Sequence, residues 1–419
     1  MNKSYFIIFF SIIFLIGSIA IFHAGYESDE NEVQNSEEKA QEYLNEKQGK
    51  ETKKEPQDKN DEKINDEKPE GTENNEEDFG EPYSPEKFEV HSDQIVNCGY
   101  SIKGIPSPKS IAFRPKSNEF WSTSLMNQNY GVVIFDFKKE KRKDLSLPGG
   151  GGTEIKFNKD GSYAYVSQME TGRIFKIDAT ERRIEKKLET ESSWTKIVDL
   201  QKDKLFASNW VGNDISKLDI DSGDLENKIS TVTTPRGIYL SGKRMYVAGF
   251  DNGEIEKHNL ETGESETLIK TGGAMRDLIG SEDYIYASDM GKGKIYMINK
   301  NDQSVKKLTE TDNNPNTIRL TPDEKILIVS NRGANNPEGY NQPGPEWGSI
   351  LFFNSQTGEK LDALVGGNQP TGLDVSSDGK NMIFSNFLDG EIIFCNLPSY
   401  EAFKTKEGRA NDYHEELIK

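Results

Sequence analysis

Few side chains in this 419-residue sequence could hold a metal ion or serve as an activated nucleophile. The chain has two cysteines and four histidines, which stand far apart along it. Zinc and iron–sulfur sites need such residues at close, regular spacing. The segment 91–403 also lacks the nucleophile-elbow, zinc-protease, Walker and EF-hand patterns. We therefore expect no metal and no cofactor, assign no catalytic residue, and favour a binding protein over an enzyme.

Cationic residues offer the first candidate site. Lys109, Lys196, Arg236 and Arg276 each stand within two residues of the start of a similar aliphatic segment. If the fold gathers them at one mouth of a channel, their field would concentrate an anionic ligand or an acidic partner on a protein whose net charge is −19. The alternative is that these charges are solvated or paired with nearby carboxylates. The overall negative charge argues against a nucleic-acid partner.

Large side chains recur at a second set of equivalent positions, and all but one of them are apolar. They are Met126, Met169, Trp210, Phe250, Met290, Arg332 and Phe387. On the same face as the cations they would form a rim for a peptide or a carbohydrate. The alternative is that they pack between structural units as part of the core.

A repeated unit of about 40 residues must position both sets. Each copy has an aliphatic segment, a turn, a second segment ending in Ser-Asn or a similar pair, a third segment and a further turn, which is Thr-Gly in two copies. The copies start at Pro108, Gly152, Trp194, Pro235, Met275, Pro315 and Pro370. Short alternating segments at this period are typical of four-stranded propeller blades. We predict an all-β, seven-bladed β-propeller over residues 91–403, followed by a C-terminal tail, 404–419.

The end of the second segment resembles the signature of the YVTN-type seven-bladed β-propellers and their lactonase-like relatives. The matching segments are AYVSQ at Ala164, LFASN at Leu205, MYVAG at Met245, IYASD at Ile285, LIVSN at Leu327 and MIFSN at Met382. The resemblance covers Cys98 to Phe403 and implies the same fold. It also implies an alternative function, a lactonase-like hydrolase at the channel mouth, for which Glu154, Asp277 and Asn316 would have to converge.

The two ends of the repeated region are expected to close the ring. Counting across the Thr-Gly turns places Phe353 opposite Lys360, and the same count in the last copy places Cys395 opposite Cys98. A strand before Pro108 would then complete the final blade. We predict a disulfide between the two cysteines, with two free thiols as the alternative.

The sixth copy is longer than the others because of an insertion, Gly333 to Gly348, rich in Pro, Gly and Asn. It carries Tyr340 and Trp347, and we predict a projecting loop that binds a partner. A channel lid or an inert insert is the alternative.

The N-terminal part of the chain predicts export. Tyr5 to Phe22 is an unbroken apolar run behind Lys3, which indicates a signal or membrane-anchor segment within residues 1–25. Residues 26–90 are rich in Glu, Lys, Asn and Asp and predict a disordered acidic linker. An uncleaved anchor is favoured over a cleaved signal peptide. The propeller would then stand on the extracytoplasmic side of the membrane and act there as a binding or scaffold module.

Overall fold

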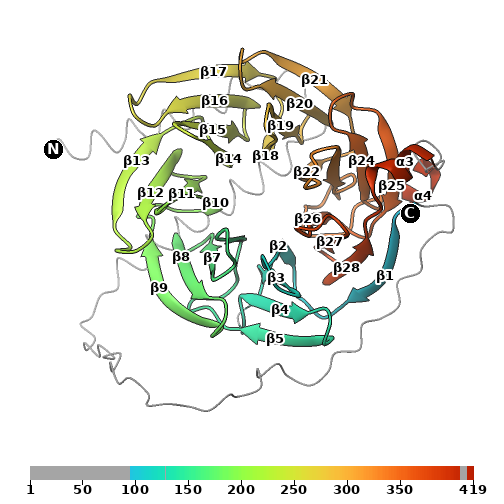
Figure 1. Ribbon diagram of the computed structural model, residues 1–419, viewed down its shortest axis with the longest axis horizontal. Helices are drawn as coiled ribbons and strands as arrows, with labels where there is room; N and C mark the ends of the chain where they lie inside the picture. The colour runs from blue at the N-terminus through green and yellow to red at the C-terminus, as the bar shows by residue number, and fades with distance from the viewer. Residues whose placement is uncertain (1–94, 128, 406–412) are drawn as a thin grey trace. The chain divides into compact units, whose positions relative to one another are not determined.

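The computed structural model describes residues 95–127, 129–405 and 413–419. Within these residues, seven four-stranded antiparallel sheets follow one another around a central axis (Figure 1). The predicted seven-bladed, all-β propeller is confirmed. The first and last inner strands are in contact, so the sheets form a closed ring.

The blades are named in chain order, and their strands run from the inner edge to the outer edge. Blade 1 is β2 (Pro108–Phe113), β3 (Glu119–Ser124), β4 (Val132–Asp136) and β5 (Lys141–Leu145). Blade 2 is β6 (Glu154–Phe157), β7 (Tyr163–Gln168), β8 (Arg173–Asp178) and β9 (Arg183–Glu189). Blade 3 is β10 (Thr195–Gln201), β11 (Lys204–Asn209), β12 (Asp214–Asp219) and β13 (Leu225–Ser230). Blade 4 is β14 (Pro235–Ser241), β15 (Arg244–Gly249), β16 (Glu254–Asn259) and β17 (Ser265–Lys270).

The remaining blades follow the same plan. Blade 5 is β18 (Met275–Gly280), β19 (Tyr284–Asp289), β20 (Lys294–Asn299) and β21 (Val305–Glu310). Blade 6 is β22 (Pro315–Leu320), β23 (Ile326–Asn331), β24 (Ser349–Asn354) and β25 (Lys360–Val365). Blade 7 is β26 (Pro370–Val375), β27 (Asn381–Asn386), β28 (Glu391–Asn396) and β1 (Asn97–Ile102).

The hydrophobic core lies between the blades. The second strand of a blade is buried on both faces; all six residues of β23 are buried, for example. The outermost strands are mostly exposed, as in β13. One core cluster joins Trp121 of blade 1 to Phe157 and Phe175 of blade 2. Burial of both sheet faces against neighbouring blades is what allows a ring of short strands to be stable.

The hairpin register follows the count made from the Thr-Gly turns. Phe353 on β24 lies opposite Lys360 on β25. The last blade has the same register, with Cys98 of β1 opposite Cys395 of β28. Local turn length therefore predicted the pairing correctly.

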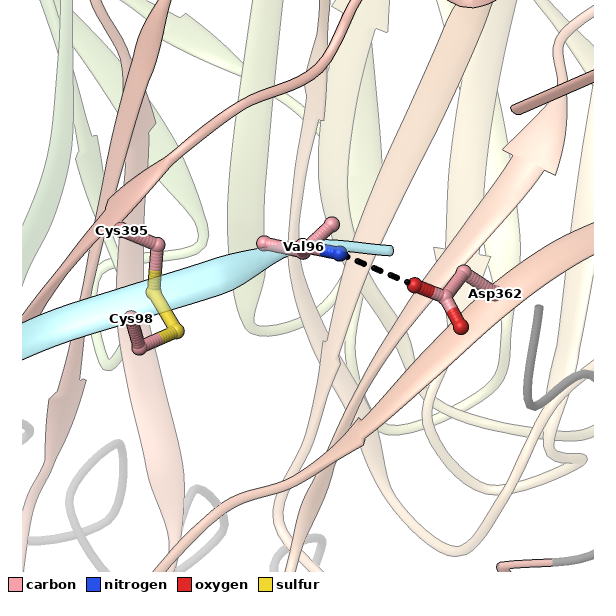
Figure 2. Close-up of a disulfide and its surroundings, with 4 residues drawn as sticks. All are labelled: Val96, Cys98, Asp362 and Cys395. Carbon is pink, nitrogen blue, oxygen red and sulfur yellow. Dashed lines mark hydrogen bonds between the residues drawn. A yellow bond between two sulfur atoms is a disulfide. The ribbon is translucent and has the colours of Figure 1, made fainter. Parts of the chain in front are cut away.

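The N-terminal strand closes the ring in two ways (Figure 2). Cys98 and Cys395 form a disulfide that links residues 297 apart in sequence. The carboxylate of Asp362, on β25 of the neighbouring blade, accepts hydrogen bonds from the backbone N–H groups of Ile95 and Val96, at 3.1 and 3.3 Å. β1 is thus held both to its own blade and to blade 6.

The C-terminal residues also pack on the propeller. Two short helices, α3 (Tyr400–Thr405) and α4 (His414–Leu417), follow the last strand. Phe403 is buried against the core of blades 6 and 7, and Tyr413 and Leu417 are buried against blades 5 and 6. Residues 413–419 fall within the predicted tail, and they lie on the propeller surface.

None of the helices in the described residues is long and apolar enough to cross a membrane. The predicted membrane segment, Tyr5–Phe22, and the predicted linker, 26–90, lie outside the described residues. Both stay predictions.

Candidate functional site

The inner strands of all seven blades line a central channel with a volume of about 1210 Å³. Each inner strand starts at the same end of this channel. The residues just inside that end are Lys109, Thr153, Lys196, Arg236, Arg276, Asn316 and Thr371. We call Lys109, Lys196, Arg236 and Arg276 the cationic mouth. The structure therefore brings these four predicted residues together.

One repeat boundary is corrected by a single residue. The predicted third repeat starts at Trp194, so Lys196 would stand two residues into its repeat, whereas Arg236 stands one residue into its own. In the structure β10 begins at Thr195, which lies opposite Asn209 as Pro235 lies opposite Gly249. Lys196 is therefore the equivalent of Arg236 and joins the mouth ring, which concentrates the positive charge.

Hydroxyl groups of the repeated signature hold the mouth residues in place. The Ser167 hydroxyl donates to the carbonyl of Lys196 at 2.9 Å, and the Ser208 hydroxyl donates to the carbonyl of Arg236 at 2.9 Å. Ser288 makes the equivalent bond to the carbonyl of Asn316 at 2.8 Å. Each bond joins the second strand of one blade to the inner strand of the next. The signature serine thus positions the neighbouring blade at the mouth.

The residue before the inner strand has a left-handed backbone in five blades. These residues are Ser107, Trp194, Thr234, Asn314 and Gln369, with φ between 47° and 58°. A positive φ is strained for residues other than glycine, so the surrounding structure must impose it. Its carbonyl accepts the N–H of the large rim residue: Trp194 from Trp210 at 3.1 Å, for example, and Thr234 from Phe250 at 3.1 Å.

The large residues of the rim are mostly buried. Trp210, Phe250 and Phe387 are only 6%, 3% and 2% exposed, so they pack between blades and do not form an open apolar rim. In blade 1 the equivalent position belongs to Leu125, whose N–H bonds the carbonyl of Ser107, and Met126 is exposed beside it.

The buried aromatic rings support the cations. The Lys196 ammonium lies 4.8 Å from the ring centroid of Trp194 and 4.5 Å from that of Trp210. The Arg236 guanidinium lies 5.4 Å from Trp210 and 5.3 Å from Phe250, and Lys109 lies 5.1 Å from Phe387. Cation–π contacts at these distances stabilise the positive form of the side chain. The predicted aromatic binding residues therefore hold the cations in place and are themselves largely buried.

Two arginines at this end of the channel are held by amide side chains. Arg276 Nε donates to Oδ1 of Asn316 on the next blade at 2.8 Å. Arg332 donates to Oε1 of Gln369 at 2.7 Å, and its guanidinium lies 5.6 Å from the ring of Tyr340. Arg332 is only 2% exposed.

The insertion between β23 and β24 is held in its middle and at its C-terminal end. The backbone carbonyl of Tyr340 accepts a hydrogen bond from Gln369, and both Tyr340 and Trp347 are half-buried. The Trp347 N–H donates to the carbonyl of Leu417 at 2.7 Å, and the ammonium of Lys419 lies 4.3 Å from the Trp347 ring. The predicted projecting loop is therefore clasped by the C-terminus, and Trp347 is partly covered by it.

A charged waist lies deeper in the channel, one and three positions beyond the mouth residues on the inner strands. Arg319 contacts Asp277 at 3.2 Å and Asp374 at 3.4 Å, and Lys156 contacts Asp199 at 3.1 Å. Sequence analysis missed four of these residues: Lys156, Asp199, Arg319 and Asp374. Their spacing at alternate positions of the inner strands was a usable signal, because alternate side chains of a strand face the same side.

The alternative hydrolase site does not form a metal centre. Asp277 is bound to Arg319 and accepts the N–H of Ile318 at 3.0 Å, while Asn316 is bound to Arg276. Among the described residues, no group of three or more His, Cys, Asp and Glu side chains is arranged to hold a metal ion. The geometry gives this alternative no support.

Glu154 is the remaining carboxylate of the waist. Burial inside the ring raises its pKa to about 7, with the negative charge of Asp277 adding to this effect. The positive charge of Arg319, a hydrogen bond from Ser110 and the charge of Lys156 oppose the rise. Burial also raises the pKa of Asp374, again against the charge of Arg319. Near neutral pH, protonation of Glu154 therefore changes the charge of the channel.

The fold and the site define a seven-bladed β-propeller with a cationic channel mouth. No protein-family model matches the chain, so membership of the YVTN-type family specifically is not established. The chain is similar to a protein of Leptospira interrogans named antigen Lp49, with 31% identity over 303 residues. The matched region makes up 67% of this chain and 66% of the relative's length.

Proposed function

We propose that this chain is an exported, membrane-tethered β-propeller that binds a protein or another anionic ligand of the cell envelope at its cationic mouth. The gathering of Lys109, Lys196, Arg236 and Arg276 at one end of a channel carries this proposal. Positive charge concentrated in a concave site of an acidic protein favours an anionic partner and speeds its approach.

The N-terminal strand β1 begins on the face of the propeller opposite to the mouth, and this position supports a tether that leaves the mouth accessible. In each blade the inner strand runs away from the mouth, and the outermost strand runs back toward it. β1 is the outermost strand of blade 7, so Asn97 lies at the face opposite to the mouth. A tether attached before Asn97 would leave the mouth facing outward. The similarity to a protein named as an antigen agrees with such display.

The proposal predicts that mouth variants lose a partner. A Lys196→Gln/Arg236→Gln double variant removes two charges while keeping side chains that can pack against the aromatic rings. Affinity capture from envelope fractions should recover a partner with the wild type and much less of it with the double variant. Lys187→Gln is the control, since Lys187 lies on the exposed strand β9 and pairs with Glu189 at 3.0 Å. Equal recovery with both variants would reject the mouth as the contact site.

A further inference from the structure

Two buried hydrogen-bond donors at the mouth lack an acceptor among the described residues. They are Nδ2 of Asn316 and Nε1 of Trp210, in side chains that are 1% and 6% exposed. Buried donors in native proteins almost always have a partner, and those that do not require an explanation. Asn316 lines the channel, and Trp210 packs against the mouth residues Lys196 and Arg236.

The amide of Asn316 is oriented by its neighbour. Its Oδ1 accepts from Nε of Arg276, and its backbone carbonyl accepts from the Ser288 hydroxyl. With Oδ1 engaged, Nδ2 is left as the unused donor of this amide, and both Asn316 and Arg276 line the channel. A guanidinium beside an amide N–H donor matches the two oxygens of a carboxylate.

The second donor marks the other end of a cationic arc. Trp210 lies on blade 3, where Lys196 and Arg236 pack against its ring at 4.5 and 5.4 Å. Asn316 lies on blade 6, next to Arg276 of blade 5. The arc from blade 3 to blade 6 therefore has positive charge along its length and one unpaired donor at each end. A single small anion would reach only one of these ends.

We infer that the mouth binds an extended acidic peptide segment, with one carboxylate held by Arg276 and Asn316 and a second acceptor held by the indole N–H of Trp210. This inference rests on the proposed function and specifies its partner. A peptide is favoured over a dense polyanion because exposed apolar side chains lie on the same face as the cations. Met126 and Val211, 48% and 42% exposed in loops of the same face, offer apolar contacts that suit a peptide.

Fluorescence anisotropy tests the inference. The probe is a fluorescein-labelled peptide of repeated Glu-Ser-Glu-Leu units, compared with its Gln-Ser-Gln-Leu counterpart. The full chain should bind the Glu peptide and not the Gln peptide. Asn316→Asp replaces the donor by a carboxylate and should weaken binding about ten-fold, as expected for one lost hydrogen bond to a charged group. Arg276→Lys keeps the charge but loses the planar fork, and it should weaken binding too.

The outcomes separate this inference from the proposed function. Binding of the Glu peptide to both variants with wild-type affinity would overturn the subsite, as would equal binding of the Gln peptide. If inorganic polyphosphate binds and the Glu peptide does not, the peptide assignment fails, whereas loss of the envelope partner from the Lys196→Gln/Arg236→Gln variant would still uphold the cationic mouth. Circular dichroism checks folding, and if Asn316→Asp is unfolded, Arg276→Lys decides the matter.

Discussion

The ammonium group of Lys419, the last residue of the chain, lies 4.3 Å from the ring centroid of Trp347 in the insertion of blade 6. Backbone bonds extend this contact: Trp347 donates to Leu417, and Lys419 donates to the carbonyl of Pro345 at 3.2 Å. Beneath them the buried Tyr413 hydroxyl donates to Asp312, at 2.8 Å from its nearer oxygen, and accepts from Lys360 at 3.1 Å. The C-terminus thus holds the insertion against the propeller.

Replacing Tyr413 should release this clasp. Tyr413→Ala removes a fully buried ring and one of the two hydroxyl groups that donate to Asp312, so we expect a loss of about 3–5 kcal/mol in local or global stability. Limited proteolysis should then cut the 333–348 insertion faster. Ile418→Ala is the control, because Ile418 is 70% exposed. A wild-type digestion pattern for Tyr413→Ala would show that the C-terminus does not restrain the insertion.

Reduction of the disulfide should destabilise the whole ring. The bond closes a loop of 297 residues, and the chain-entropy relation gives roughly 6 kcal/mol for a loop of this length. Guanidinium unfolding of the Cys98→Ala/Cys395→Ala variant should show a lower midpoint than the oxidised wild type. Reductant should lower the wild-type midpoint and leave the variant unchanged. A variant as stable as the oxidised protein would show that strand pairing alone closes the ring.

Glu154 should make stability depend on pH. Its pKa is raised in the folded protein to about 7 from 4.5, so the folded state holds a proton that the unfolded state has lost between these values. The contribution of Glu154 to the free energy of unfolding therefore falls as pH rises from about 4.5 to 7, by at most ~1.4 kcal/mol per pH unit. Above that range it changes little. Glu154→Gln removes this dependence.

Urea unfolding of both proteins at pH 5 and pH 7.5 measures the effect. The difference in unfolding free energy, Glu154→Gln minus wild type, should be larger at pH 7.5 than at pH 5. The carboxyl of Asp374 titrates in both proteins, so its contribution largely cancels in the comparison. The same difference at both pH values would show that the Glu154 carboxyl has its ordinary pKa.

The signature serines should stabilise blade contacts. Ser208→Ala leaves the buried carbonyl of Arg236 without its hydroxyl donor, and we expect a loss of about 1–2 kcal/mol in unfolding free energy. Ser265→Ala, on the exposed outer strand β17, should change stability by less than about 0.5 kcal/mol. Blade 4 has Ala248 at this position, so the fold tolerates one missing hydroxyl. If the two serine variants are equally stable, the Ser208 hydroxyl does not stabilise the contact between blades.

Much of the fold could be predicted from the sequence alone. The blade number, the turn register and the pairing of Cys98 with Cys395 depend on alternation and turn length, which act over a few residues and recur in every copy. The four cations of the mouth were found for the same reason. Where the repeat lacked its proline, at Trp194, the count slipped by one residue, because β10 begins with Thr195.

The tertiary structure decided what lies between blades. Nothing in the spacing of Trp210 and Lys196 showed that the ring would be buried beneath the cation, and nothing in Asp277, Arg319 and Asp374 showed that they would meet, since the three stand on different blades. The clasp of Trp347 by Lys419 likewise joins segments with no shared pattern. Such contacts depend on distances across the closed ring, whereas sequence periodicity reports only the neighbours within one blade.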